Sequence, residues 1–300
     1  AIAMLIVSAI VLTSSTFAWF SMSKEAKIEQ MDLTVSSPEG IQISANASAW
    51  PASLTNNALF NENSTSRYKA YDGNVNLMPL NLIPVSTIFR YTNSTTGAMN
   101  FYKATLDDAG KATVTPVSQT AGNDDIAGLV AFDVFFKVAN DTVVYFSTSE
   151  FTDNSSSDIL TALRVAFQPM GNTDSTDAAT AIALKTTQER TSVIYEPDAV
   201  NRSADAIAAG QSTGVLTTKG IKNESSAGNV NENFILANNN CEAPYANVVT
   251  SEAAASAKSF NLKAGVSKYR IYIWVEGNDV DCRNSVAGAV LSAALKFTID

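Results

Sequence analysis

The side-chain type most used for acid–base and metal chemistry is missing from this chain. The sequence contains no histidine, which removes the commonest general base and the commonest zinc ligand. It has no Gly-rich phosphate loop and no Gly-x-Ser-x-Gly elbow, and nothing pairs a particular Ser or Thr with a base. The sequence therefore predicts a non-enzymatic protein, with no catalytic residue, no metal ligand and no cofactor.

Two turns rich in Asp and Asn carry the best candidate oxygen ligands. They cover residues 171–177 and 277–281. Neither has the spacing of an EF-hand loop with its final Glu, so we expect solvated turns rather than calcium sites. Glu276 ends an apolar stretch just before the second turn. We expect a surface charge at a strand end there, with a buried polar anchor as the alternative.

The chain has two cysteines, Cys241 and Cys282. They are too few for a zinc cage, and an even pair in an exported chain predicts one disulfide. Such a bridge closes a loop of about 42 residues and stabilises the fold by roughly 4 kcal/mol on the chain-entropy model. Two buried, reduced thiols are the alternative.

Composition places the chain among exported proteins. Its 300 residues are 46% hydrophobic, enough for a substantial core. Only 16% are charged, and 20 basic against 29 acidic residues give a net charge of −9. This balance provides no positive surface for nucleic acid or for an anionic membrane. We expect a secreted protein outside the cell that does not bind nucleic acid.

The N-terminal segment, residues 1–23, carries no charge, and Lys24 is the first ionisable side chain. A helix of about 20 residues is long enough to span a bilayer. Three interpretations stay open. The segment is retained as the packing helix of a pilin-like subunit, which the start at Ala1 favours; it is a secretory signal cleaved after Ala18; or it is a plain membrane anchor.

The retained-segment interpretation is preferred, with membrane contact before assembly. Helices that are apolar on all sides must be buried, here against other subunits. The expected intersubunit residues are the N-terminus and the apolar side chains that follow: Ala1, Ile2, Leu5, Ile6, Val7, Ile10, Val11, Leu12, Phe17, Trp19 and Phe20.

Beyond the segment, apolar residues alternate with polar ones, which predicts β-strands. Met31, Leu33 and Val35 start this pattern, and a Pro-Gly turn leads to residues 41–45, so we expect a hairpin. Short helices are candidates at residues 158–166, 174–190 and 252–258, and surface loops at 52–77 and 200–230. Further strands are expected at residues 85–91, 99–105, 112–117, 128–138, 143–148, 160–167, 192–195, 260–263, 269–276 and 289–299.

This layout predicts a mainly β fold. Because long helical periods between strands are missing, we expect an antiparallel β-sandwich or jelly roll with an N-terminal hydrophobic helix or assembly segment. The expected division is a segment at residues 1–23 and a β-rich extracellular domain at residues 24–300, with an inserted subdomain at about 150–245 as an option.

Four stretches carry a resemblance: STFAWFS at residues 15–21, MDLTV at 31–35, EGIQIS at 39–44 and YRIYIWVEGNDVDC at 269–282. They resemble exported, clostridial-type surface or filament proteins. Residues 18–35 are more distantly similar to the TasA/camelysin biofilm-fibre family. The resemblance implies a jelly-roll subunit that polymerises when an N-terminal strand completes a neighbour's sheet. The metalloprotease activity described for camelysin-type relatives is not carried over, because this chain has no HExxH motif.

These observations together predict a structural subunit of an extracellular filament, a pilus, fimbrium or biofilm-matrix fibre on the cell surface. The partner is the chain itself, in a head-to-tail homopolymer that polymerises through its N-terminal segment; a host or neighbouring cell surface is a further candidate partner. The alternative is a membrane-anchored surface adhesin or a carbohydrate-binding β-sandwich, since such modules share the fold class and the polar loops.

Overall fold

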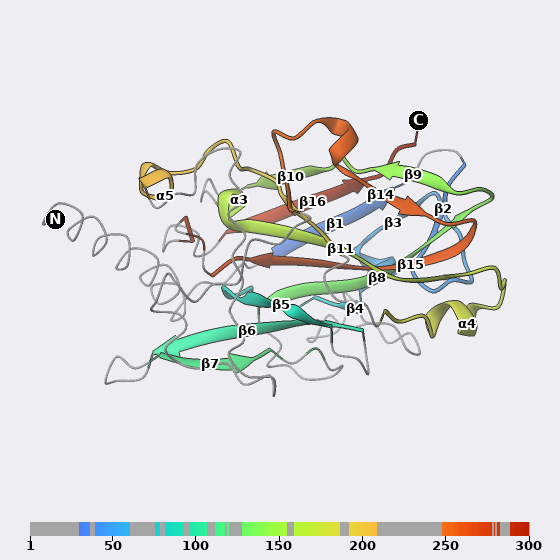
Figure 1. The fold of residues 1–300 in the computed structure, drawn as a ribbon, viewed down its shortest axis with the longest axis horizontal. Coiled ribbons are helices and arrows are strands. Elements are labelled where there is room, and N and C mark those ends of the chain that lie inside the picture. The colour runs from blue at the N-terminus through green and yellow to red at the C-terminus, as the bar shows by residue number, and fades with distance from the viewer. Residues whose placement is uncertain are drawn as a thin grey trace, which may run out of the picture.

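A computed structural model describes residues 30–36, 40–60, 76–78, 82–92, 97–106, 112–117, 119, 128–154, 159–186, 192–208, 248–277, 279, 281–282 and 289–299. The described chain is mainly β, as the sequence predicted. Figure 1 shows its strands in layers, with short helices at the margins. All statements below concern these residues.

A four-stranded sheet forms one layer, in the order β10-β16-β1-β3. Its inner strands are β16 (Val290–Lys296) and β1 (Gln30–Ser36), and its outer strands are β10 (Glu150–Asp153) and β3 (Ser53–Leu54). β1 runs parallel to β16, whereas β10 and β3 pair antiparallel with their neighbours. The last described strand of the chain thus lies beside the first.

A seven-stranded sheet forms the second layer, in the order β13-β12-β11-β15-β8-β2, with β4 also paired to β8. The long central strand β15 pairs antiparallel with both of its neighbours, β11 and β8. β12 and β13 pair in parallel at one side. The strands are β2 (Gln42–Ser44), β4 (Asn76–Leu77), β8 (Leu129–Val138), β11 (Leu163–Thr173), β12 (Val193–Glu196), β13 (Val248–Thr250) and β15 (Gly265–Val275).

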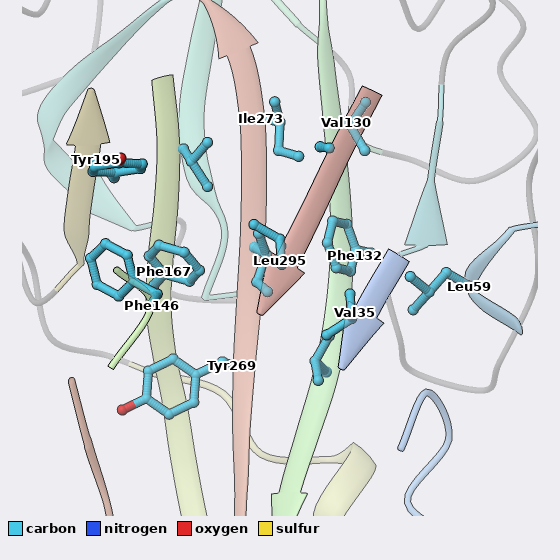
Figure 2. Packing of buried hydrophobic residues seen from close by; sticks show 14 of the residues in the cluster. Val35, Leu59, Val130, Phe132, Phe146, Phe167, Tyr195, Tyr269, Ile273 and Leu295 are labelled. Carbon is cyan, nitrogen blue, oxygen red and sulfur yellow. The ribbon is translucent and has the colours of Figure 1, made fainter. Parts of the chain in front are cut away.

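The main hydrophobic core lies between these two sheets. Figure 2 shows Val35 and Leu295, from the four-stranded sheet, against Phe132 and Ile273 of the seven-stranded sheet. Side chains alternate along a strand, so every second residue of β15, from Tyr269 to Val275, points into this core. The other residues of β15 point to the opposite face, which is also covered. Burial on both faces explains why β8 and β15 carry apolar residues at many adjacent positions instead of alternating strictly with polar ones.

Smaller elements close the ends and the second face. Figure 1 shows the three-stranded sheet of β5, β6 and β7 along one side of the molecule, and Phe101 from β6 packs with Tyr272 and Trp274 of β15. The remaining elements are β5 (Ser86–Thr92), β6 (Met99–Leu106), β7 (Ala112–Pro116), β9 (Thr142–Tyr145), β14 (Ser259–Leu262), α2 (Asn56–Leu59), α3 (Ile159–Ala162), α4 (Ala178–Ile182), α5 (Ala204–Ala208) and the 3-10 helix Ala255–Ala257.

The expectation of a purely antiparallel fold is wrong, and so is the expected hairpin. Two strand pairs are parallel, β1 with β16 and β12 with β13. β1 and β2 lie in different sheets instead of pairing across the Pro-Gly turn. The physical reason is that a period-two pattern reports which face of a strand is buried, but neither its partner nor the partner's direction.

The expected surface loop at residues 52–77 is also wrong in its first part. Leu54, Leu59 and Phe60 are buried at 1%, 0% and 1% exposure, on β3, on α2 and just after it. Isolated apolar residues in a polar stretch give no periodicity, so the sequence did not predict this contribution to the core. Strands β10 and β13 were missed for a related reason, since each is only three or four residues long.

Candidate functional site

Strand β1 is the candidate assembly element, because it follows the apolar segment and is inserted in the middle of a sheet. Its parallel pairing with β16 runs over the whole strand, from Gln30 opposite Val290 to Ser36 opposite Lys296. On its other side, β3 pairs only with the last two residues of β1. β16 therefore provides most of the backbone pairing that holds β1 in the sheet.

The end of β1 is anchored by one core side chain. Val35 has 0% exposure, and Figure 2 shows it near Leu59 and Leu295 in the core between the sheets. Thr34, one residue earlier, is exposed. Full burial of a valine side chain is worth about 1.5–3 kcal/mol. This apolar contact therefore contributes to stability in addition to the backbone pairing.

The backbone of β1 points toward β16 at every second residue. The Ser36 carbonyl oxygen accepts a hydrogen bond from the N–H of Phe297, at 3.0 Å. Backbone groups alternate in direction along a strand, so the N–H of Thr34 points to the same side as this carbonyl. Thr34 thus combines an exposed side chain with a ladder position on the β16 side.

One short connection joins β1 to the rest of the described body. After residues 37–39, Gly40 adopts φ +99°, and Ile41 enters the core at 5% exposure. β2 then begins in the seven-stranded sheet. β1 is consequently tied through its C-terminal end to a strand of the opposite layer, and it shares no hairpin with that strand.

A second candidate site is a ring of four buried charged side chains at the start of β11. Arg164 Nε lies 3.2 Å from Glu196 Oε1, and Arg202 Nη2 lies 2.6 Å from Glu196 Oε2. Both arginines also reach Asp279 Oδ2, Arg202 through Nη1 at 3.1 Å and Arg164 through Nη2. None of the four side chains exceeds 1% exposure. The ring alternates positive and negative groups and closes on itself.

The ring is fixed to the backbone and keeps its charge. Arg164 Nη1 donates to the carbonyl oxygens of Thr161 and Leu163, at 3.0 and 2.9 Å. Burial by itself lowers the pKa of Arg164, but the negative charges of Glu196 and Asp279 outweigh it and raise the pKa overall. Arg164 therefore stays a cation at every pH at which the protein folds.

The acidic groups beside the ring are hydrogen-bonded as well. Glu276 Oε2 accepts from Trp274 Nε1 at 3.1 Å. Asp281 Oδ2 accepts from the N–H of Ser203 at 3.1 Å, and the N–H of Asp281 donates to Asp279 at 2.9 Å. These bonds join the segment after β15 to the segment before α5. The arrangement locks three parts of the chain together.

Cys282 lies against this charged cluster and is buried. Burial, followed by the nearby charges of Asp279 and Glu276, raises the pKa of a thiol at this position well above its usual range. A thiolate nucleophile is thus disfavoured here. With its carboxylates engaged by guanidinium and amide donors, the cluster has the character of a structural lock rather than of a catalytic centre.

A third polar group lies on the second face of the seven-stranded sheet. Asp133 of β8 receives a forked contact from Arg270 of β15, with Nε at 2.7 Å and Nη2 at 3.0 Å from its two oxygens. Lys268 Nζ lies 3.2 Å from Asp133 and donates to the Ile182 carbonyl oxygen at 2.6 Å. Burial lowers the pKa of Lys268, and Asp133 partly offsets this. These pairs fix α4 to the sheet.

The residues that the sequence assigned to assembly and to the disulfide are placed only in part. Cys282 is described and Cys241 lies outside the described residues, so their pairing stays a prediction. The expected intersubunit residues also lie outside the described part of the chain: Ala1, Ile2, Leu5, Ile6, Val7, Ile10, Val11, Leu12, Phe17, Trp19 and Phe20.

Of the two Asp/Asn-rich turns, the first agrees with the expectation of an exposed turn and the second does not. Asp177 caps α4 by accepting from the N–H of Thr180 at 2.9 Å, which fits an exposed structural turn. The second turn is not solvated at its acidic positions, because Asp279 and Asp281 have 1% and 5% exposure. Glu276 is a buried anchor at 0% exposure, so the surface-charge interpretation is wrong and its alternative is confirmed. The ring arginines were missed; a lone Arg164 within an apolar strand was the available signal.

Two searches of the described residues found nothing. No three or more acidic or cysteine side chains there gather in a way that could hold a metal ion. Within the same residues, every helix is too short or too polar to cross a bilayer. Comparison of the chain with family models, curated proteins and solved structures gave no match.

Proposed function

We propose that this chain is the structural subunit of an extracellular filament, a head-to-tail homopolymer on the cell surface. The observation that carries the proposal is the position of β1. It is an inner strand of the four-stranded sheet, it pairs along its whole length with β16, and its C-terminal end leads to β2 in the other sheet. A strand held in this way can be supplied by a second copy of the chain.

The chemistry of the β1 position suits an identical strand. Val35 of β1 belongs to the same cluster of buried apolar side chains as Leu54, Leu59 and Leu295. The neighbouring strands offer backbone hydrogen-bonding groups, which pair with any extended chain. The buried side chain of the inserted strand provides the specificity. A head-to-tail contact of this kind does not close on itself, so repetition produces a filament rather than a dimer.

Strand exchange alone does not drive assembly. A β1 strand makes the same contacts in its own subunit as in a neighbour's, so the free energies of the two arrangements nearly cancel. We therefore assign the driving force to residues 1–23. Burial of 1,000 Å2 of apolar surface contributes about 25 kcal/mol before the entropy cost of association. β1 then determines the geometry of the contact, and the apolar segment makes it stable.

The finer assignments belong to the same proposal. The two facing sheets support a jelly-roll-like sandwich, altered by its parallel pairs, with the N-terminal helix or segment outside the body. We also propose contact with the membrane before assembly and a disulfide between the two cysteines. The resemblance to clostridial-type surface proteins and to the TasA/camelysin family is in keeping with an exported filament subunit. An adhesin or carbohydrate-binding module remains the alternative, and a monomer that binds a glycan would favour it.

The first experiment tests exchange of β1 between subunits. A benzophenone amino acid replaces the exposed Thr34 in chains labelled with nitrogen-14 and nitrogen-15, which are mixed as denatured monomers and assembled. After irradiation, mass spectrometry reads the isotopes of β1–β16 cross-linked peptides. We expect filaments in which a large share of these peptide pairs carries both labels.

A matched control carries the same photoreactive group at Asp141, which is exposed and pairs with Lys263 of the same body, Nζ to Oδ2 at 2.6 Å. Cross-links from this position should join peptides of one label only. If filaments form but the cross-linked pairs at Thr34 carry one label only, β1 is not exchanged between subunits. Residues 1–23 would then make the intersubunit contact alone. A chain that stays monomeric under all assembly conditions would refute the filament itself.

The mature N-terminus separates the two routes to a filament. Intact mass and N-terminal sequencing are measured on protein extracted from the cell surface. We expect residues 1–18 to be present in the extracted protein, which would mean that the apolar segment belongs to the filament. A start at Trp19 would show a cleaved signal and leave β1 exchange as the mode of assembly.

A further inference from the structure

The ladder between β1 and β16 has a direction that matters when the chain is pulled. Because the two strands are parallel, the N-terminal end of β1 and the C-terminal end of β16 lie at opposite ends of the ladder. A pull that enters through residues before Gln30 and leaves through residues after Lys296 slides one strand along the other. All the ladder bonds then carry the load together.

β16 is held on its other side, so it does not follow β1. It pairs antiparallel with β10, from Glu150 opposite Ala294 to Asp153 opposite Leu291. The N–H of Asn154 donates to the Val290 carbonyl oxygen at 2.8 Å, and Ser149 Oγ bonds both backbone groups of Lys296 at 3.1 and 3.2 Å. Both ends of β16 are therefore fixed to the body.

The residues after β16 are fixed too. Thr298 exchanges two backbone hydrogen bonds with Tyr145 of β9, each at 2.8 Å. Phe297 is buried at 2% exposure and packs edge-on against Phe136, with ring centroids 5.1 Å apart. A force applied at the C-terminal side therefore acts first on these contacts of Phe297 and Thr298. Only after they yield does it act on the β1–β16 ladder.

We infer that the β1–β16 ladder is a mechanical clamp, which makes this chain a load-bearing element for tension along its length. Shear breaks several hydrogen bonds in one step, whereas a pull at one end of the ladder breaks them one after another. Forced unfolding is governed by the rate of that first step. The clamp is a property of the single folded chain, so it goes beyond the proposed filament and does not need polymerisation.

The test compares two attachment pairs on the full chain in a single-molecule tweezers experiment at constant load. In the first pair, handles at the N- and C-termini shear the ladder. In the second, the C-terminal handle moves to Asn154, which is exposed and lies beside Val290 at the end where β1 begins. That pair peels β1 from its first residue.

We expect the folded lifetime under the same load to be about tenfold longer, or more, for the terminal pair, because each further bond broken in a shared step adds to the activation barrier and so multiplies the lifetime. Equal lifetimes, or a longer lifetime for the Asn154 pair, would overturn the clamp. Two variants sharpen the result. Thr34→Pro removes a ladder N–H without touching the core and should shorten the terminal-pair lifetime severalfold, whereas Thr34→Ala retains the N–H and should leave it unchanged.

The outcome is independent of the filament test. If the chain stays monomeric but its lifetime is longer for the terminal pair, the clamp is supported and the filament is refuted. If the chain forms filaments but the two lifetimes are equal, the filament is supported and the clamp is refuted. The comparison of the two attachment pairs uses the unmodified ladder, so it decides the matter even where Thr34→Pro fails to fold.

Discussion

Ser36 and Phe297 are joined by a backbone hydrogen bond, from the Phe297 N–H to the Ser36 carbonyl oxygen at 3.0 Å. This bond connects the end of the first described strand to the residue that follows the last one. Beside it, Val35 is buried in the core, whereas Thr34 is exposed. Adjacent residues of one strand therefore differ sharply in what their side chains contribute.

Replacement of Val35 should reveal this difference. Val35→Ala removes two methyl groups from a fully buried site and should lower the free energy of unfolding by about 2 kcal/mol, from lost burial and a residual cavity. Thr34→Ala is the matched control and should change it by less than about 0.5 kcal/mol. Urea unfolding followed by tryptophan fluorescence measures both. Equal effects of the two variants would show that β1 does not pack as described.

The buried ring predicts a large loss when one partner is removed. Arg164→Met leaves Glu196 and Asp279 short of a cation in the interior, which should cost about 3–5 kcal/mol. The double variant Arg164→Met with Glu196→Leu should cost clearly less than the sum of the two single variants, because the two charges leave together. Chemical denaturation of all four chains provides this cycle.

An exposed ion pair is the control for the ring. The side chains of Lys263 and Asp141 are 67% and 60% exposed. Lys263→Met breaks their contact and should have no measurable effect on stability. Additive effects in the Arg164 and Glu196 cycle would contradict a coupled ring.

Tyr269 predicts a loss of stability in alkali. Burial raises the pKa of Tyr269 from its ordinary value of 10.0, and its hydroxyl donates to the Asn261 carbonyl oxygen at 2.8 Å. Above about pH 10 the unfolded chain releases this proton while the folded chain retains it, so the free energy of unfolding falls as the pH rises. The contribution is fully present below that pH.

A Tyr269→Phe variant isolates this group. The variant should lose part of the alkaline slope between about pH 9 and pH 12, although it starts from a lower stability. Lys268 acts in the opposite sense, because its lowered pKa makes stability rise toward about pH 10.4. Urea unfolding gives the free energy of unfolding of the wild type and of Tyr269→Phe at each pH. Lys268 is present in both chains, so its contribution cancels in the difference between them. Identical slopes would place the Tyr269 hydroxyl in solvent.

Two glycines with positive φ should tolerate alanine unequally. At Gly265, φ is +95° and a methyl group would lie 2.5 Å from the Thr173 carbonyl oxygen. At Gly40, φ is +99°, but the nearest atom would be Ile299 Cδ1 at 3.4 Å, an ordinary contact. Gly40→Ala should cost about 1 kcal/mol from backbone strain, and Gly265→Ala distinctly more. Thermal unfolding gives the order, and a reversed order would contradict this geometry.

The disulfide is tested chemically. Protein extracted without reductant, unfolded and treated with iodoacetamide should show no alkylation at Cys241 or Cys282. Reduction should then lower the free energy of unfolding by roughly 4 kcal/mol. Alkylation of both residues before reduction would favour the reduced alternative.

Local sequence patterns predicted most strands because they report burial. The alternation that ends at Val35 and the apolar run of β15 both lie in strands close to their expected bounds. The same patterns do not predict which other strand a given strand pairs with. The parallel position of β1 beside β16 depends on the remainder of the chain, so no window around residue 35 could reveal it.

The buried ring shows the opposite limit. Asp279 and Asp281 stand in a turn whose composition is typical of solvent, and nothing in the neighbouring residues predicts two arginines from elsewhere in the chain. Arg164 is unusual within an apolar strand, because a buried charge needs a partner of opposite charge. That signal predicts that a partner exists, but not which acidic residue it is.

The parallel neighbours β1 and β16 also impose an order on folding. β1 is synthesised before β16, its main partner strand, so the four-stranded sheet cannot close until nearly all the described residues have been made. Closure over such a long sequence separation is slow. Throughout that interval the edge of β1 has no β16 beside it, so slow closure lengthens the time in which the exchange proposed above competes with folding.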